Sequence, residues 1–283
     1  MNTYGWSQFD QYLLVNVVVL FGIGLVAPLA LGGRWRWWLV AASSVAAGMC
    51  VPAGRAVWLA APLAVPVVGA IRRHARGPFP LAIATGWAGA AAGAIGFSLG
   101  GAQLFGIGEP IVRLTAVHYF YAGVGALAIA HRLHRIAVGR IAIAAKVAVV
   151  ATAAAPPVVA LGFVVRHPLA QVGGAVLMTI GVWAAAIAML GMGRRWTGRR
   201  RVAAVVAGLA TWVPMVLAVL WAASNYWLDV PALPVPVMAR THGVVNAVGF
   251  VVAGLWATRP EVPRLRSVDP LHEHTAADGE VAA

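Results

Sequence analysis

Long apolar runs fill most of the chain and are separated by short stretches rich in arginine, proline and glycine. Several of these runs extend for about 20 residues, the length at which an α-helix crosses the hydrocarbon core of a bilayer. We therefore predict an all-α fold, a polytopic bundle of transmembrane helices. The expected spans cover residues 10–32, 37–51, 56–71, 80–102, 110–130, 141–165, 169–192, 202–223 and 236–257.

The expected spans at 37–51 and 56–71 are short, and proline or glycine interrupts them. They form either two complete crossings or a re-entrant pair, so the number of spans lies between seven and nine. Both arrangements return the chain to the same side of the membrane. The sidedness of the later spans is therefore the same in either case.

The composition supports a membrane protein over a water-soluble one. Of the 283 residues, 61% are hydrophobic and 10% are charged, whereas soluble domains carry about 25% charged residues. The net charge of +13 suggests nucleic acid at first sight, but the basic residues lie in short loops between apolar runs. Nucleic-acid binding needs basic residues gathered on one face of a folded domain. We therefore expect a lipid bilayer, and no nucleic acid, as the partner of this chain.

Lys and Arg residues fall mostly on one side of the membrane when the expected spans are counted in alternation. Cytoplasmic loops carry such an excess, which predicts a multi-pass protein of the plasma membrane with its amino terminus outside. After a bundle at residues 1–257, residues 258–283 contain too few apolar side chains to form a core and are predicted to be a disordered cytoplasmic tail. The cytoplasmic set is Arg34, Arg36, Arg72, Arg73, Arg76, Arg132, Arg135, Arg140, Arg194, Arg195, Arg199, Arg200, Arg201, Arg259, Arg264 and Arg266, whereas Arg55, Arg113 and Arg166 lie on the other side.

Ionisable side chains are rare within the expected spans, and most of them gather in two segments. A charged group at the centre of a bilayer costs about 3 kcal/mol on insertion scales, so such residues are candidates for function. The two groups are Glu109, Arg113, Thr115, His118 and Tyr121 at the start of the span at 110–130, and Arg240, His242 and Asn246 at the start of the span at 236–257.

Helical spacing places these polar side chains along one stripe of each helix. Thr115, His118 and Tyr121 follow one another at three-residue steps, and His242 and Asn246 are four residues apart. At 1.5 Å per residue, His118 and His242 lie roughly 12 Å and roughly 9 Å from the outer ends of their helices. We therefore predict that the two stripes meet in the outer half of the bundle and bind a ligand there.

A purely structural interpretation also fits these residues. Glu109 can pair with Arg113 at the membrane surface, and Arg113 and Arg240 lie shallow enough to extend toward water. Each histidine can bond a backbone carbonyl or a hydroxyl of a neighbouring helix. Asn16, a polar residue in the first apolar run, is expected to form a hydrogen bond between helices.

The two polar segments resemble the YndJ-like family of bacterial membrane proteins. The matching stretches are GEPIVRLTAVHYFYAG at residues 108–123 and THGVVNAVGF at residues 241–250. The family's first stretch has a second histidine shortly after the position of His118, where this chain has tyrosine and phenylalanine. The resemblance implies a membrane protein and names no substrate or reaction.

Three functions fit the sequence. The first is a carrier of a small solute, an ion or a proton, because histidine changes its charge near neutral pH. The second is a membrane-embedded redox protein or enzyme in which His118 and His242 ligate a haem iron or another metal ion. The third is a structural or assembly factor for other membrane proteins. The chain has no nucleophile elbow, P-loop or dinucleotide-binding motif, which argues against nucleophilic or nucleotide-dependent enzyme activity.

Overall fold

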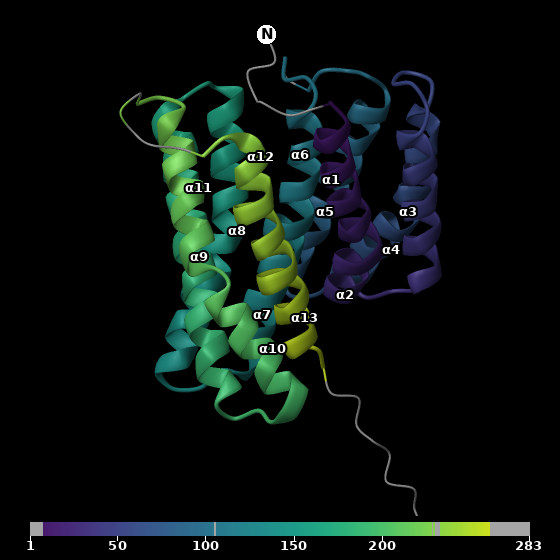
Figure 1. Cartoon of the computed structure of the whole chain (residues 1–283). Helices are drawn as coiled ribbons and strands as arrows, with labels where there is room; N and C mark the ends of the chain where they lie inside the picture. The colour runs from purple at the N-terminus through teal and green to yellow at the C-terminus, as the bar shows by residue number, and fades with distance from the viewer. Residues whose placement is uncertain (1–7, 105, 228, 230–232, 261–283) are drawn as a thin grey trace, which may run out of the picture.

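The chain folds into a bundle of long helices, seen from the side in Figure 1. The computed structural model describes residues 8–104, 106–227, 229 and 233–260. Within this part of the chain, the only β-type pairing is an isolated bridge between Leu104 and Ile107. The predicted all-α class is therefore confirmed for the described residues. Most of the predicted tail, residues 261–283, lies outside them.

Eight of the nine expected spans correspond to continuous helical stretches, some of them partly π- or 3-10-helical, whereas a turn at Ala210 and Thr211 divides the span expected at 202–223. The largest difference concerns the span expected to end at residue 130, which continues to Ile136. The elements are α1 (Gln8–Phe21), η1 (Gly22–Val26), α2 (Ala27–Leu31), α3 (Trp35–Met49), η2 (Val57–Leu63), α4 (Ala64–His74), α5 (Phe79–Leu99), α6 (Ile111–His118), η3 (Tyr119–Ala126), α7 (Leu127–Ile136), α8 (Arg140–Val164), α9 (Pro168–Gly193), α10 (Gly198–Leu209), α11 (Trp212–Ser224), α12 (Val235–Met238), η4 (Ala239–Val252) and α13 (Ala253–Ala257).

Proline and glycine determine where several of these helices begin. Pro168 occupies the first turn of α9, where its missing N–H removes no helical hydrogen bond. Pro62 lies in η2, and the stretch becomes α-helical only at Ala64. Gly139 precedes α8 with a φ of +60°, a backbone conformation that glycine adopts without steric cost.

Six helices of the described part are long and apolar enough to cross a membrane. The stretch α3, the stretch η2–α4 and the stretch α12–η4–α13 are not among them, so the ninefold crossing stays a prediction. The six are Leu13–Leu31, Phe79–Leu99, Ile111–Ile136, Arg140–Val164, Pro168–Gly193 and Gly198–Ser224.

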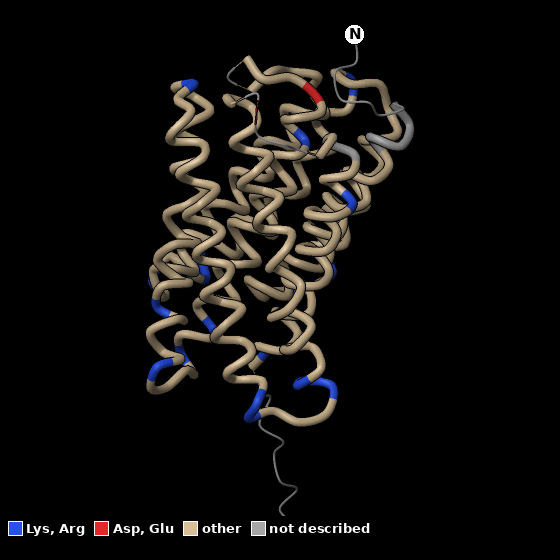
Figure 2. Tube along the Cα trace, turned by 60° about the vertical axis from the view of Figure 1, so that its left-hand side comes forward, with Lys and Arg blue, Asp and Glu red and all other residues tan. Residues whose placement is uncertain are grey.

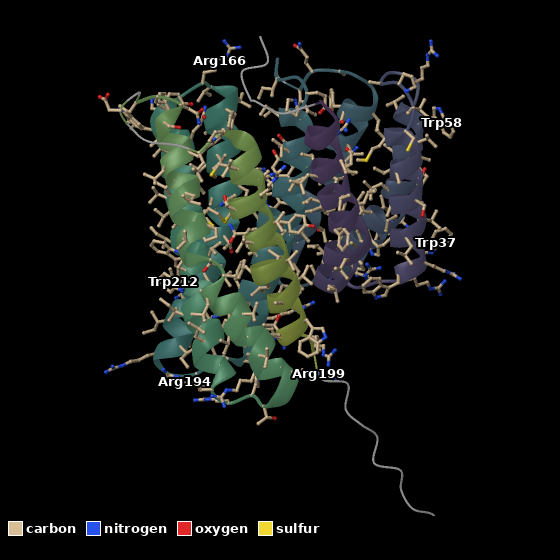
Figure 3. The ribbon with its side chains drawn as sticks, in the orientation of Figure 1. Trp37, Trp58, Arg166, Arg194, Arg199 and Trp212 are labelled. Carbon is tan, nitrogen blue, oxygen red and sulfur yellow. The ribbon has the colours of Figure 1, made fainter. Side chains whose placement is uncertain are left out.

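The outward-facing side chains fit a lipid environment. Ile143, Leu169 and Val213 are each about two-thirds exposed, which is unfavourable in water and favourable against lipid tails. Trp37 and Trp58 are also exposed and lie near opposite ends of the part of the bundle that contains α3 and α4 (Figure 3). Tryptophan is enriched at the two interfaces of a membrane. The chain is therefore a membrane protein.

Two groups of helices stand on either side of a central pair of helical stretches. One group contains α8 to α11 and the other contains α1 to α5 (Figure 1). The stretch α6–η3–α7 lies between them and contacts both α5 and α8. The stretch α12–η4–α13 contacts α10 and α11, and its π-helical segment also contacts η1 and η3. The three π-helical segments therefore meet at the centre of the molecule.

Glycines allow α8 and α9 to approach each other closely. A Cβ atom at Gly174 would lie 2.9 Å from the backbone nitrogen of Val159, and one at Gly181 would lie 2.9 Å from the backbone nitrogen of Thr152. Small residues at such contacts let neighbouring transmembrane helices pack backbone to backbone.

Substitution of Gly174 by alanine should destabilise this helix pair. The added methyl group meets the backbone of α8, which has no rotamer by which to move away, and overpacking of this kind costs about 1–3 kcal/mol. Gly173 is the matched control, since a Cβ atom there meets nothing within 4 Å. Thermal unfolding in detergent should show a lower midpoint for Gly174→Ala and an unchanged or higher midpoint for Gly173→Ala. Equal midpoints would contradict the packing described here.

Lys and Arg residues gather toward the end of the bundle opposite the amino terminus (Figure 2). Arg194 and Arg199 lie at that end, and Arg166 lies at the other (Figure 3). This distribution is compatible with a cytoplasmic location of the arginine-rich end.

Cysteine labelling tests the predicted orientation. Cys50 is the only cysteine in the sequence and is exposed, so the background carries Cys50→Ser. Arg166 and Arg194 are exposed residues at opposite ends of α9. On intact cells, a membrane-impermeant maleimide should label the Arg166→Cys variant, whereas Arg194→Cys should react only after permeabilisation. The reverse pattern would show that the amino terminus is cytoplasmic.

Candidate functional site

Arg113 is a polar side chain with hydrogen-bond partners on two other helices. It lies in the first turn of α6 and is only 8% exposed. Its Nε donates to the hydroxyl of Ser98 on α5 at 2.9 Å, and one terminal nitrogen donates to Oδ1 of Asn16 on α1 at 2.7 Å. Three helices are therefore joined at one guanidinium group. The predicted helix–helix hydrogen bond of Asn16 is confirmed.

Glu109 lies one turn before Arg113 and faces the same guanidinium. Its Oε1 is 3.7 Å from the other terminal nitrogen of Arg113, a distance that allows charge attraction and exceeds a normal hydrogen bond. Both carboxylate oxygens are buried and accept no hydrogen bond from any described residue. The carboxylate is therefore paired in charge and unsatisfied in hydrogen bonding.

A cavity of about 300 Å³ lies beside this ion pair. Its wall has a polar side, made by the carboxylate, the guanidinium, the amide and the hydroxyl described above, and an apolar side. The residues that line it are Asn16, Met49, Ala53, Ser98, Glu109 and Arg113.

The remaining predicted residues of α6 and η3 make separate contacts. The hydroxyl of Thr115 donates to the backbone oxygen of Ile111 within its own helix. His118 is exposed, and its Nδ1 lies 2.7 Å from the backbone oxygen of Leu114, also in its own helix. The hydroxyl of Tyr121 donates to the backbone oxygen of Val18 on α1 at 3.0 Å.

The polar residues of η4 contact α11. His242 places Nδ1 2.8 Å from the backbone oxygen of Pro214 and 3.2 Å from Nδ2 of Asn246. Asn246 also approaches the sulfur of Met215, whereas the side chain of Arg240 is exposed. Because a carbonyl oxygen can only accept, Nδ1 of His242 carries the proton, so the amide nitrogen of Asn246, itself a donor, forms no hydrogen bond with that atom.

The predicted residues thus fall into two groups. Glu109 and Arg113 line the cavity with residues of α1, α3 and α5, whereas His242 and Asn246 pack on α11. A single site that unites both stripes stays a prediction.

Three cavity residues were outside the set singled out from sequence: Met49, Ala53 and Ser98. Ser98 and Met49 belong to apolar helices on which neither stands out. A serine in an apolar helix more often bonds its own backbone, so no local signal distinguishes Ser98 from a structural serine. Only its position opposite Arg113 reveals its role.

The described residues contain no group of three or more His, Cys, Asp or Glu side chains that can hold a metal ion. A metal site made of protein ligands alone would therefore need residues beyond the described part. Haem ligation by His118 and His242 stays a prediction.

Comparison with known families gives a clear assignment. The model of the YndJ-like protein family matches residues 16–250, which is most of the chain. The chain belongs to the YndJ-like family. The resemblance predicted from two short segments is therefore confirmed, and in this YndJ-like chain those segments contain α6 and parts of η3 and η4. Searches of curated proteins and of solved structures gave no match.

Loss of the Asn16 acceptor should destabilise the contact between α1 and α6. Asn16→Ala leaves the buried guanidinium of Arg113 without one of its partners, at a cost of about 1–3 kcal/mol. Thr115→Ala is the control, since this hydroxyl bonds only within its own helix among the described contacts. Thermal unfolding in detergent should show a clear decrease for Asn16→Ala and little change for Thr115→Ala. A similar midpoint for both variants would show that the Asn16 bond contributes nothing.

Proposed function

We propose that this YndJ-like protein is a plasma-membrane carrier for a small polar solute, which it recognises in the outer cavity next to Glu109 and Arg113. In this proposal the chain crosses the membrane nine times, with the amino terminus outside, so that the cavity opens toward the outer face. The buried, unsatisfied carboxylate of Glu109 is the observation that carries the proposal.

The carboxylate favours a solute site over a purely structural ion pair. Buried polar atoms in proteins nearly always have a hydrogen-bond partner, and a structural pair would bring the carboxylate within hydrogen-bond distance of the guanidinium. Here the nearest approach is 3.7 Å, and a cavity lies alongside. The side chain of Glu109 lines this cavity, and turning its carboxylate toward a ligand breaks no hydrogen bond of the described residues.

A carrier must change conformation to move its solute, and we expect the helices to bend at the π-helical segments in the centre of the bundle. The segments η1, η3 and η4 are π-helical and contact one another, and π-helical turns occur frequently at functional sites. Glycines lie at these contacts: a Cβ atom at Gly22 would lie 3.0 Å from Cβ of Phe120, and one at Gly125 would lie 3.2 Å from Cγ1 of Val26. Interrupted helices near the bilayer midplane are also common in known transporters.

The redox and assembly alternatives have no comparable support among the described contacts. An absorption spectrum of the purified protein tests the first, because a haem ligated by His118 and His242 gives a Soret band. Co-purification of a stoichiometric membrane partner would favour the second.

Transport in proteoliposomes tests the proposal directly. We expect purified protein to accumulate one class of labelled solute from a panel of amino acids, amines, organic acids and sugars. Glu109→Gln should reduce this uptake at least tenfold, because an amide presents one acceptor oxygen where the carboxylate presents two, and carries no charge. Asp229→Asn is the matched control, since Asp229 is an exposed acid in a loop. Uptake of no class by wild-type protein, or equal uptake by Glu109→Gln, would overturn the carrier proposal.

Alanine variants of the two histidines test the predicted stripe in the same assay. His242 bonds the backbone of α11, whereas His118 bonds only its own helix among the described contacts. We expect His242→Ala to lower uptake at least threefold and His118→Ala to leave it nearly unchanged. A loss of similar size in both variants would favour joint action of the two rings.

A further inference from the structure

The cavity wall carries two opposite charges side by side. The carboxylate of Glu109 is 3.7 Å from the guanidinium of Arg113, and both groups line the same space. Together they form a local dipole with no net charge. A ligand that complements this wall presents a positive group to Glu109 and a negative group to Arg113.

The surroundings disfavour a ligand with a single charge. Arg113 and both carboxylate oxygens of Glu109 are buried, so charges at the site are screened less than charges in water. A simple amine or a simple anion would leave one unit of net charge in this environment, at a substantial desolvation cost. A zwitterion adds no net charge and can pair with both side chains.

Hydrogen bonding specifies the positive group. The two oxygens of Glu109 receive no donor from the described residues, and a primary ammonium group offers three N–H donors. A quaternary ammonium group offers none and would leave the oxygens unsatisfied. The positive group of the ligand should therefore be a primary amine.

The remainder of the cavity limits the size of the ligand. Its volume of about 300 Å³ lies at the small end of the range for ligand sites. Met49 and Ala53 provide the apolar part of its wall. These features fit a short aliphatic chain and leave little room for a large aromatic or polymeric solute.

We propose that the cavity binds a small aliphatic zwitterion, with its primary ammonium group at the carboxylate of Glu109 and its carboxylate facing the guanidinium of Arg113. This inference rests on the proposed solute site and adds the chemical class of the solute. In this inference, the ion pair of Glu109 and Arg113 determines which solutes bind.

Binding to the full-length protein in detergent tests the assignment. The probes are glycine, β-alanine and γ-aminobutyrate, which differ in charge separation, together with butylamine and butyrate, which each carry one of the two charges. Isothermal titration calorimetry should show that at least one zwitterion binds tenfold or more tightly than both singly charged probes. Equal or tighter binding of butylamine or butyrate would overturn the assignment, and so would the absence of binding by all five probes.

Variants locate the bound molecule. Glu109→Gln should weaken zwitterion binding at least tenfold, and Asp229→Asn should leave it unchanged. The thermal unfolding midpoint of Glu109→Gln, measured without ligand, shows that the variant is folded. Unchanged zwitterion binding by folded Glu109→Gln would place the ligand elsewhere and overturn the assignment.

Different results would reject this inference and the carrier proposal. Zwitterion binding without any uptake by proteoliposomes would reject the carrier and keep the assigned ligand class. Uptake of a singly charged solute that depends on Glu109 would keep the carrier and reject the zwitterion.

Discussion

The stretches α1–η1–α2 and α6–η3–α7 are joined by hydrogen bonds at three levels. Arg113 donates to Asn16 near one end, Tyr121 donates to the backbone oxygen of Val18 in the middle, and Arg132 donates to the backbone oxygens of Leu29 and Ala30 at the other end. Lipid offers no water to satisfy such donors, so they must find partners inside the protein. These two hydrogen-bonded stretches, called the frame below, are the part of the bundle against which other helices pack.

The last helical stretch, α12–η4–α13, also forms a hydrogen bond with the frame. Arg132 also donates to the backbone oxygen of Leu255, and Arg200 donates to that of Ala257 at 2.8 Å. The final carbonyl groups of a helix lack internal partners and carry partial negative charge, so arginine suits these positions. Between the two ends, η1, η3 and η4 pack through glycine contacts. Arginine side chains thus join the ends of these helical stretches, while small residues and van der Waals contacts hold η1, η3 and η4 together in the middle.

The cavity beside Glu109 and Arg113 departs from the rule that buried polar atoms have hydrogen-bond partners. Asn16 and Ser98 satisfy donors of Arg113, yet the carboxylate beside it keeps two buried oxygens without a donor. A packed structural core would not retain such an arrangement, because unsatisfied buried polar groups are costly. The proposed solute site depends on this feature, because a carboxylate with few competing donors is a strong acceptor for a ligand.

The sequence by itself determined the membrane location, the helical class and the approximate helix positions, because long apolar runs have few other stable solutions in lipid. It also identified Asn16 as a helix–helix contact, and two polar segments pointed to the family whose model matches the chain. Only the tertiary structure decided that Arg113 meets Asn16 and Ser98, and that His242 packs on Pro214 of α11. Residue spacing fixes which side chains share a face of one helix, but the rotation of that helix against its neighbours depends on packing across the whole bundle. For that reason the polar stripe stays a prediction, and the partners of its residues emerged only from the assembled helices.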